Sequence, residues 1–120
     1  MTDAKRGEVW EIRFDPSEGD EIQKIRPAVV MTARSAGRVQ LHIVVPITGW
    51  KPQFGRYFWM IHLLSDVASG LQKESAADAF QVKSLSVNRF QRRLGSLADD
   101  TVEEVAAAIA LCIGYALPES

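Results

Sequence analysis

The hydrophobic pattern of this chain changes its period once, near residue 98. Before that point the apolar residues form short runs that alternate with polar residues or stay continuous, which predicts strands. After it, apolar residues recur at helical spacing. Strands followed by one terminal helix predict a mainly-β α+β domain, a small twisted barrel or sheet closed by the helix. The residues at helical spacing are Val102, Val105, Ile109, Cys112, Ile113 and Ala116.

The first strand has the clearest pattern. Trp10, Ile12 and Phe14 alternate with charged residues, so we expect a strand with one buried face. Residues 27–32 form a continuous apolar run, which predicts a strand buried on both faces. Further strands are expected at 41–48, 57–64, within 75–85 and at 93–97, with loops at 15–25 and 49–56.

The terminal helix has signals for its start and its end. Thr101 with Glu104 matches a capping box, and Asp99 or Asp100 is an alternative cap. Acidic residues here also suit the positive end of the helix dipole. Pro118 is expected to end the helix. Its apolar face can serve the core or an interface, and we expect the core, with Cys112 a core residue and not a metal ligand.

Composition limits the class of protein. The 120 residues fit one domain over residues 1–120, because two domains would each have a marginal core. One Cys excludes an internal disulfide and a Cys-cluster zinc site, and two His argue against a His-rich metal site. We therefore expect no metal and no cofactor. No apolar run approaches ~18 residues and no signal-peptide core follows the first residues, so we expect a cytoplasmic protein.

Charge is distributed unevenly, although the net charge is only −1. Residues 1–21 hold three basic and seven acidic residues, and residues 94–120 hold five acidic and no basic ones. Residues 22–93 hold eleven basic and three acidic residues. A basic middle segment predicts a face for a polyanion such as nucleic acid. A solvated surface with uneven charge explains the pattern equally well at this point.

A hairpin around Gly37 would bring two polar residues together. If paired residue numbers sum to about 74, Arg26 lies opposite Thr48, with Cβ atoms about 5 Å apart. A guanidinium fork and a hydroxyl can then bind one phosphate. Glu21, in the neighbouring loop, offers a proton acceptor for a 2′-hydroxyl. In the alternative, structural interpretation, Arg26 pairs with Glu21 at the rim and Thr48 only ends a strand.

Several blocks of sequence occur in a specific order and spacing. They are Arg6-Gly7-Glu8-Val9-Trp10, Phe14-Asp15-Pro16-Ser17, Gly19-Asp20-Glu21, Lys24-Ile25-Arg26-Pro27-Ala28-Val29-Val30, Val45-Pro46-Ile47-Thr48, Gly70-Leu71, Gln81-Val82-Lys83-Ser84 and Arg93-Leu94-Gly95-Ser96-Leu97. With these blocks the chain resembles the MazF/PemK family of toxin endoribonucleases over residues 6 to about 115.

The resemblance implies an SH3-like or CcdB-like barrel with a C-terminal helix, working as a homodimer. It implies metal-independent cleavage of single-stranded RNA at short sequences, and neutralisation by a cognate antitoxin. The family's catalytic residues fall on Arg26, Thr48 and Glu21. The hypothesis is an attack of the 2′-hydroxyl on its own phosphate, which leaves a 2′,3′-cyclic phosphate and a 5′-hydroxyl.

Bases of the substrate need stacking surfaces and cations. We expect RNA contacts in the loop 49–56 and beyond, although Trp50 and Phe54 can equally pin that loop to the barrel. Arg89, Arg92 and Arg93 can extend the RNA path or bind an acidic antitoxin. The expected RNA-binding residues are Lys24, Trp50, Lys51, Arg56, Gln81 and Lys83.

The chain also departs from the family pattern. Asp20 stands where Ser is usual, and Phe80 precedes Gln81 where Asp or Glu is usual. The loop 49–56 belongs to this chain alone, so the sequence that is cut does not transfer. Two other functions stay open, a gyrase inhibitor of the same fold that acts by binding and an inactive RNA- or protein-binding barrel. His42 and His62 fit structural roles better than acid–base catalysis.

Overall fold

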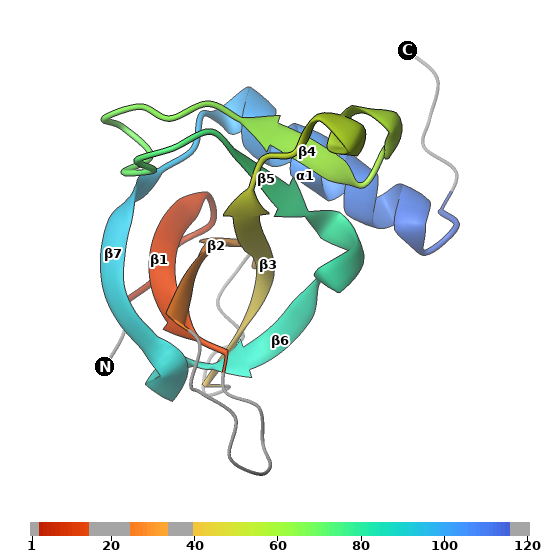
Figure 1. Cartoon of the computed structure of the whole chain (residues 1–120). Coiled ribbons are helices and arrows are strands. Elements are labelled where there is room, and N and C mark those ends of the chain that lie inside the picture. The colour runs from red at the N-terminus through yellow and green to blue at the C-terminus, as the bar shows by residue number, and fades with distance from the viewer. Residues whose placement is uncertain (1–2, 15–24, 34–39, 116–120) are drawn as a thin grey trace, which may run out of the picture.

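The computed structural model describes residues 3–14, 25–33 and 40–115. Within them the chain forms seven strands, three short 3-10 helices and one α-helix (Figure 1). No helix in the described part is long and apolar enough to cross a membrane. The strands are β1 (Glu8–Arg13), β2 (Ile25–Val30), β3 (Leu41–Gly49), β4 (Met60–Leu63), β5 (Ser75–Asp78), β6 (Lys83–Ser86) and β7 (Phe90–Ser96). The helices are η1 (Pro52–Arg56), η2 (Ala79–Gln81), η3 (Val87–Arg89) and α1 (Asp99–Cys112).

The strands form one antiparallel sheet in the order β4-β5-β3-β2-β1-β7, with β6 also paired to β3. The sheet curves strongly, and α1 lies across the end of the molecule where β4 and β5 run (Figure 1). One core cluster joins Val102 and Val105 of α1 to the strands. The predicted fold class, a mainly antiparallel β structure with one C-terminal helix, is confirmed.

The register between β2 and β3 matches the sequence prediction. Ala28 pairs with Pro46, Val29 with Val45 and Val30 with Val44, so each pair sums to 74. The printed ladder ends at Ala28, and continuing it by two residues brings Arg26 opposite Thr48. The proline at position 27 has no N–H to donate. The two strands therefore separate at the point where these polar side chains leave them.

The strand predicted within residues 75–85 is present as β5, but a second strand, β6, was not predicted, and a 3-10 helix separates the two. Pairs between β3 and β5, such as Ile47 with Ala77, sum to 124. Pairs between β3 and β6, such as Val44 with Lys83, sum to 127. The shift of three residues along one edge of β3 is taken up by η2, which leaves the ladder.

The buried faces of β1 and β2 match the prediction, except that β1 is also buried on its second face at Val9. Trp10, Ile12 and Phe14 all belong to or pack against the same core cluster, which confirms their shared face. Val9, on the other face, is also fully buried in the cluster below α1. In the apolar run after Pro27, alternate residues enter the two clusters, so the strand is buried on both faces as predicted.

The ends of α1 differ from the prediction. The Val102 N–H donates to the Ala98 carbonyl, so Ala98 occupies the N-cap position without a side-chain cap. The predicted caps at positions 99–101 are wrong because the helix starts before them. The helix stops at Cys112, ahead of Pro118, and Gly114 follows with a φ of +82°. Ile113 is 74% exposed, so it lies outside the core.

The segment before β5 is held tightly against β7. A Cβ atom at Gly95 would collide with the carbonyl oxygen of Ala68, and one at Gly70 would collide with that of Leu94. Gly70 also has a φ of +75°, which disfavours any other residue. The Ser96 N–H donates to the Ala68 carbonyl at 2.8 Å. Two of the sequence blocks, at 70–71 and 93–97, therefore form one backbone-to-backbone contact.

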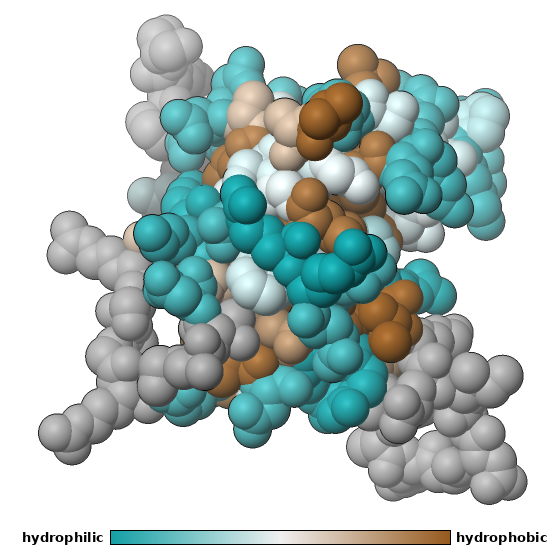
Figure 2. Space-filling model, turned by 90° about the vertical axis from the view of Figure 1, so that its left-hand side faces the viewer, coloured by the Kyte–Doolittle hydropathy of each residue, from teal (hydrophilic) through white to brown (hydrophobic). Residues whose placement is uncertain are grey.

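The edge strand β7 exposes charged and polar side chains. Figure 2 shows the side that lies at the left of Figure 1, where hydrophilic residues fill most of the middle and apolar residues form separate patches. Gln91, Arg92 and Arg93 are exposed on β7. Charged side chains on an edge strand oppose pairing with another chain.

Candidate nucleic-acid site

The predicted pair Arg26 and Thr48 lines a cavity of about 410 Å³. Its wall combines a cation, a hydroxyl, a carboxylate, an amide and aromatic rings. The full lining is Phe14, Arg26, Pro46, Thr48, Phe54, Met60, Asp78, Gln81 and Lys83. Two of the predicted RNA-binding residues, Gln81 and Lys83, therefore lie in the same cavity as two of the predicted catalytic residues.

Strand register explains why these side chains meet. Thr48 pairs with Ala76 of β5, and Asp78 pairs with Met60 of β4. Paired residues share a face of the sheet, and so do residues two apart on one strand. Thr48, Asp78 and Met60 therefore lie on one face of the sheet, together with Arg26.

The 3-10 helix η2 brings further polar groups to this face. Gln81 ends η2 and Lys83 begins β6, just where the chain rejoins β3. The Lys83 ammonium lies 5.4 Å from the centre of the Phe14 ring, a cation–π distance. The cavity thus has a cation on each side, Arg26 from β2 and Lys83 from β6.

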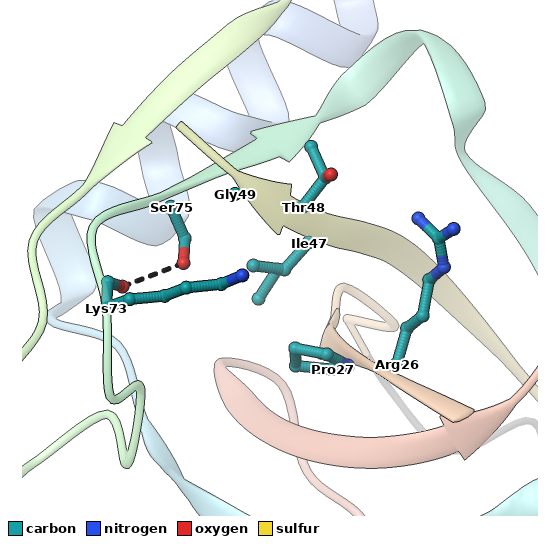
Figure 3. Close-up of a pocket in the computed structure, with 7 residues that line it drawn as sticks. All are labelled: Arg26, Pro27, Ile47, Thr48, Gly49, Lys73 and Ser75. Atoms are coloured by element: carbon teal, nitrogen blue, oxygen red, sulfur yellow. Dashed lines mark hydrogen bonds between the residues drawn. The ribbon is translucent and has the colours of Figure 1, made fainter. Parts of the chain in front are cut away.

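A second cavity of about 320 Å³ adjoins the first and shares Arg26 and Thr48 with it. Figure 3 shows Lys73 and Arg26 entering from opposite sides, with the end of β3 between them. The Lys73 Nζ lies 3.4 Å from where a Cβ would stand on Gly49. Ser75 Oγ donates to the Lys73 carbonyl at 2.9 Å. Sequence reasoning missed Lys73 because its position depends on the pairing of β5 with β3.

The loop 49–56 is pinned by its own aromatic residue. The Trp50 ring stacks on His62 with centroids 4.0 Å apart, and His62 Nε2 lies 2.6 Å from a Glu74 carboxylate oxygen. Trp50 also meets Phe54 edge-on, and only Phe54 of the two lines the larger cavity. One face of the Trp50 ring is therefore occupied within the protein.

The remaining predicted residues lie apart from these two cavities or outside the description. Lys51 and Arg56 are exposed at the two ends of η1 and line neither cavity. Glu21 and Lys24 lie outside the described residues. In the described part, no group of three or more His, Cys, Asp or Glu could hold a metal ion.

The basic residues of β7 have partners inside the protein. Arg92 pairs with Glu11, and Arg93 pairs with Glu8. Arg89, in η3, donates to the Arg13 carbonyl. Arg26, by contrast, has no ion pair within residues 3–14, 25–33 and 40–115. The cavity cation Arg26 is thus available to bind a ligand.

Asp78 is the acidic group of the larger cavity, and sequence reasoning did not single it out. Burial raises the pKa of its carboxyl above the ordinary value. The backbone N–H groups of Phe80 and Gln81 and the charge of Lys83 act in the opposite direction, but burial prevails. Side chains alternate between the two faces of a strand, so the face of Asp78 could have been predicted if the pairing of β5 with Thr48 had been known.

Comparison with known proteins identifies the family of this chain. The sequence matches the PemK-like, MazF-like toxins of type II toxin–antitoxin systems over residues 5–113. The chain belongs to this family. The resemblance inferred from the sequence blocks is therefore confirmed. Endoribonuclease MazF9 of Mycobacterium tuberculosis is 32% identical to it over 114 residues, which cover 89% of this chain and 93% of the relative.

Solved structures of the family share the fold. MazF from Deinococcus radiodurans superimposes with a TM-score of 0.73 at 22% identity, covering 92% of this chain and 96% of its own. An endoribonuclease from a mycobacterial species, solved in complex with its cognate antitoxin, gives a TM-score of 0.70 at 15% identity, covering 94% and 97%. At these identities the structures support the fold of this MazF-like chain.

Proposed function

We propose that this MazF-like chain is a toxin endoribonuclease that cuts single-stranded RNA without a metal ion. The observation that supports it most directly is the β2–β3 register, which directs Arg26 and Thr48 to one cavity. Cleavage proceeds by attack of the 2′-hydroxyl on the adjacent phosphate. The P–O5′ bond breaks, and the products are a 2′,3′-cyclic phosphate and a 5′-hydroxyl.

Arg26 stabilises the negative charge that builds up on the phosphorus oxygens. A guanidinium keeps its proton at neutral pH, so its role is electrostatic rather than that of a general acid. Thr48 donates its hydroxyl to a non-bridging oxygen of the same phosphate. The preorganised pair thus binds the transition state more tightly than the substrate.

Glu21 accepts the proton of the attacking 2′-hydroxyl in this proposal. The assignment rests on the family resemblance and on the position of Glu21 in the segment that leads into β2. RNA is the substrate because DNA has no 2′-hydroxyl to attack.

The substrate lies along the cavity, with its phosphates near the cations and its bases against the aromatic rings. Gln81 and Lys83 line the cavity itself. Lys24, Lys51 and Arg56 then contact RNA beyond it, and Trp50 offers the ring face that His62 does not cover. The chain acts in the cytoplasm as a homodimer, stops growth by cutting mRNA, and is neutralised by an antitoxin, as befits a type II toxin.

The test uses mixed-sequence single-stranded RNA in EDTA. We expect discrete fragments whose ends are cyclic phosphate and 5′-hydroxyl. The preferred cleavage site is then made as an oligonucleotide with a single 2′-deoxy residue on the 5′ side of the cut bond. We expect cleavage at this bond to disappear while cleavage at any other bond remains. Intact RNA across all sequences would overturn the proposal, and a gyrase-inhibition assay would then test the binding alternative.

A further inference from the structure

The Asp78 carboxylate lacks a partner that its surroundings should give it. Its Oδ1 is shut off from solvent and has no hydrogen-bond partner in the described part of the structure. Buried polar atoms are nearly always hydrogen-bonded, and leaving one unpaired destabilises the fold. Asp78 stands at the N-cap of η2, where the nearby Phe80 and Gln81 N–H groups act to lower its pKa, but its side chain makes no capping hydrogen bond of good geometry there. The fold therefore leaves one oxygen of this carboxylate without a hydrogen bond.

The group also faces a place where a ligand fits. Asp78 is only partly buried and lines the same 410 Å³ cavity as Arg26 and Thr48. The last torsion of an Asp side chain is soft, so a small turn presents either oxygen to a donor in the cavity. Burial, which raises the pKa of this carboxyl, is consistent with a functional site as well.

Charge decides which part of an RNA Asp78 can contact. A carboxylate repels a phosphate, so the phosphate lies beside Arg26 rather than beside Asp78. A base, in contrast, presents amino N–H groups that a carboxylate accepts well. Single-stranded RNA exposes these edges, and proteins recognise them by hydrogen bonds with the base stacked on aromatic rings. Phe14 and Phe54 line the cavity and provide such rings.

We propose that Asp78 is a specificity-determining residue, which accepts a hydrogen bond from an amino group of the base beside the cut phosphate. This inference rests on the proposed ribonuclease function. Gln81, three residues along and in the same cavity, adds one donor and one acceptor. Asp78 and Gln81 together select a base that carries an amino group, and they reject uracil at that position.

The first experiment compares the cleavage preferences of the wild type and Asp78→Leu, which has a similar shape but no hydrogen-bond acceptor, on a randomised single-stranded RNA pool, read by sequencing the cut ends. We expect the wild type to favour an amino-bearing base at one position. The variant should lose that preference by about 10- to 100-fold while still cutting other sequences. Glu103→Gln removes the same charge on α1, where Glu103 pairs with Arg6, and should leave the preference unchanged.

A uniform fall in rate over all sequences, with the preference retained, would overturn the inference and indicate a structural or acid–base role for Asp78. A pH–rate profile separates these two roles, because only the loss of an acid or base removes a limb of the profile.

The closing experiment measures binding and does not depend on cleavage. Non-cleavable oligonucleotides with a 2′-O-methyl group at the cut site carry either the preferred base or its analogue without the amino group. The wild type should bind the analogue about 10-fold more weakly, and Asp78→Leu, which lacks the acceptor, should bind the two within a factor of about two. Equal binding of both by the wild type would overturn the inference. If the wild type cuts no RNA, amino-bearing bases and their analogues are compared at each position of a non-cleavable oligonucleotide, and discrimination at one position would keep the base contact of Asp78 while the proposed function fails.

Discussion

Two carboxylates on strands of the same sheet have opposite surroundings. Glu8, at the start of β1, receives the Trp10 Nε1–H at 3.0 Å and the Lys5 N–H at 2.9 Å, and its other oxygen pairs with Arg93 at 3.1 Å. Burial acts to raise the pKa of Glu8, but these partners outweigh it and hold the pKa below 4.5. Asp78 has an unpaired Oδ1, and burial raises its pKa.

The difference distinguishes charged groups that are paired within the fold from charged groups in the cavity that can bind a ligand. On the β1–β7 side each charge has a partner within the chain, which satisfies the buried end of β1 and keeps the edge strand polar. On the cavity side Arg26 has no ion pair within the described residues, and the Asp78 Oδ1 has no hydrogen-bond partner there, at a cost in stability. Groups kept unpaired in a cavity are candidates for function.

Replacing the cavity cation should have the largest effect. Arg26→Ala should lower the rate of RNA cleavage by about 10²–10³, because one preorganised contact to the transition state is lost. Arg92→Ala removes the same charge from the β7 side, where the guanidinium pairs with Glu11, and should change the rate less than about threefold. Single-turnover kinetics on one oligonucleotide measure both. Equal losses in the two variants would remove the distinction between the two sides.

Removing the hydroxyl opposite Arg26 should have the next largest effect. Thr48→Val keeps the side-chain shape but loses a hydrogen bond to a charged oxygen, so the cleavage rate should fall about 10- to 100-fold. Thr48→Ser keeps the hydroxyl and should retain most of the activity. A ratio of rates near one between the Val and Ser variants would show that the hydroxyl does not contact the phosphate.

The paired carboxylate should matter for stability. Glu8→Gln should lower the free energy of unfolding at pH 7 by about 1–3 kcal/mol, because a charged acceptor of several hydrogen bonds is lost. A lowered pKa stabilises the fold above the ordinary value of 4.5, and this contribution disappears as the pH falls through the native pKa. Urea unfolding at pH 7 and pH 3 should therefore show the loss mainly at pH 7.

Replacing the Asp78 carboxylate should change the free energy of unfolding by less than Glu8→Gln does, and in the opposite direction. A raised pKa contributes stability at low pH that is lost as the pH rises through the native value. Asp78→Asn should therefore raise the free energy of unfolding at pH 7 by less than about 1 kcal/mol, with no gain near pH 3. A destabilised variant at pH 7 would show that the carboxylate has a structural partner after all.

The parts of the fold that sequence reasoning predicted are local. The shared face of Trp10, Ile12 and Phe14 follows from a period of two within one strand. The β2–β3 register follows from a hairpin, in which a turn fixes the pairing of both strands. The predicted start of α1 was wrong because the Val102 N–H donates to the Ala98 carbonyl, so the helix begins before the capping pattern at Thr101.

The lining of the cavity was predicted as far as the hairpin reaches. Arg26 and Thr48 lie on its two strands, and Lys83 and Gln81 came from sequence blocks shared with the family. Trp50 was open to two interpretations, and its stacking on His62 favours the pinned loop. Asp78 was missed because its face depends on β5, which pairs with β3 across more than twenty-five residues of chain.

The sequence by itself determined the class of fold, the family and the register of β2 with β3, which directs Arg26 and Thr48 to one end of the hairpin. Each of these depends on periodicity or on motifs that neighbouring residues contain. Only the tertiary structure decided which charges have partners. The link of Glu8 to Arg93 and the three-residue shift at η2 that leaves Asp78 in the cavity join segments far apart in the chain. Such contacts arise when the curved sheet brings distant strands together, and no local pattern records them.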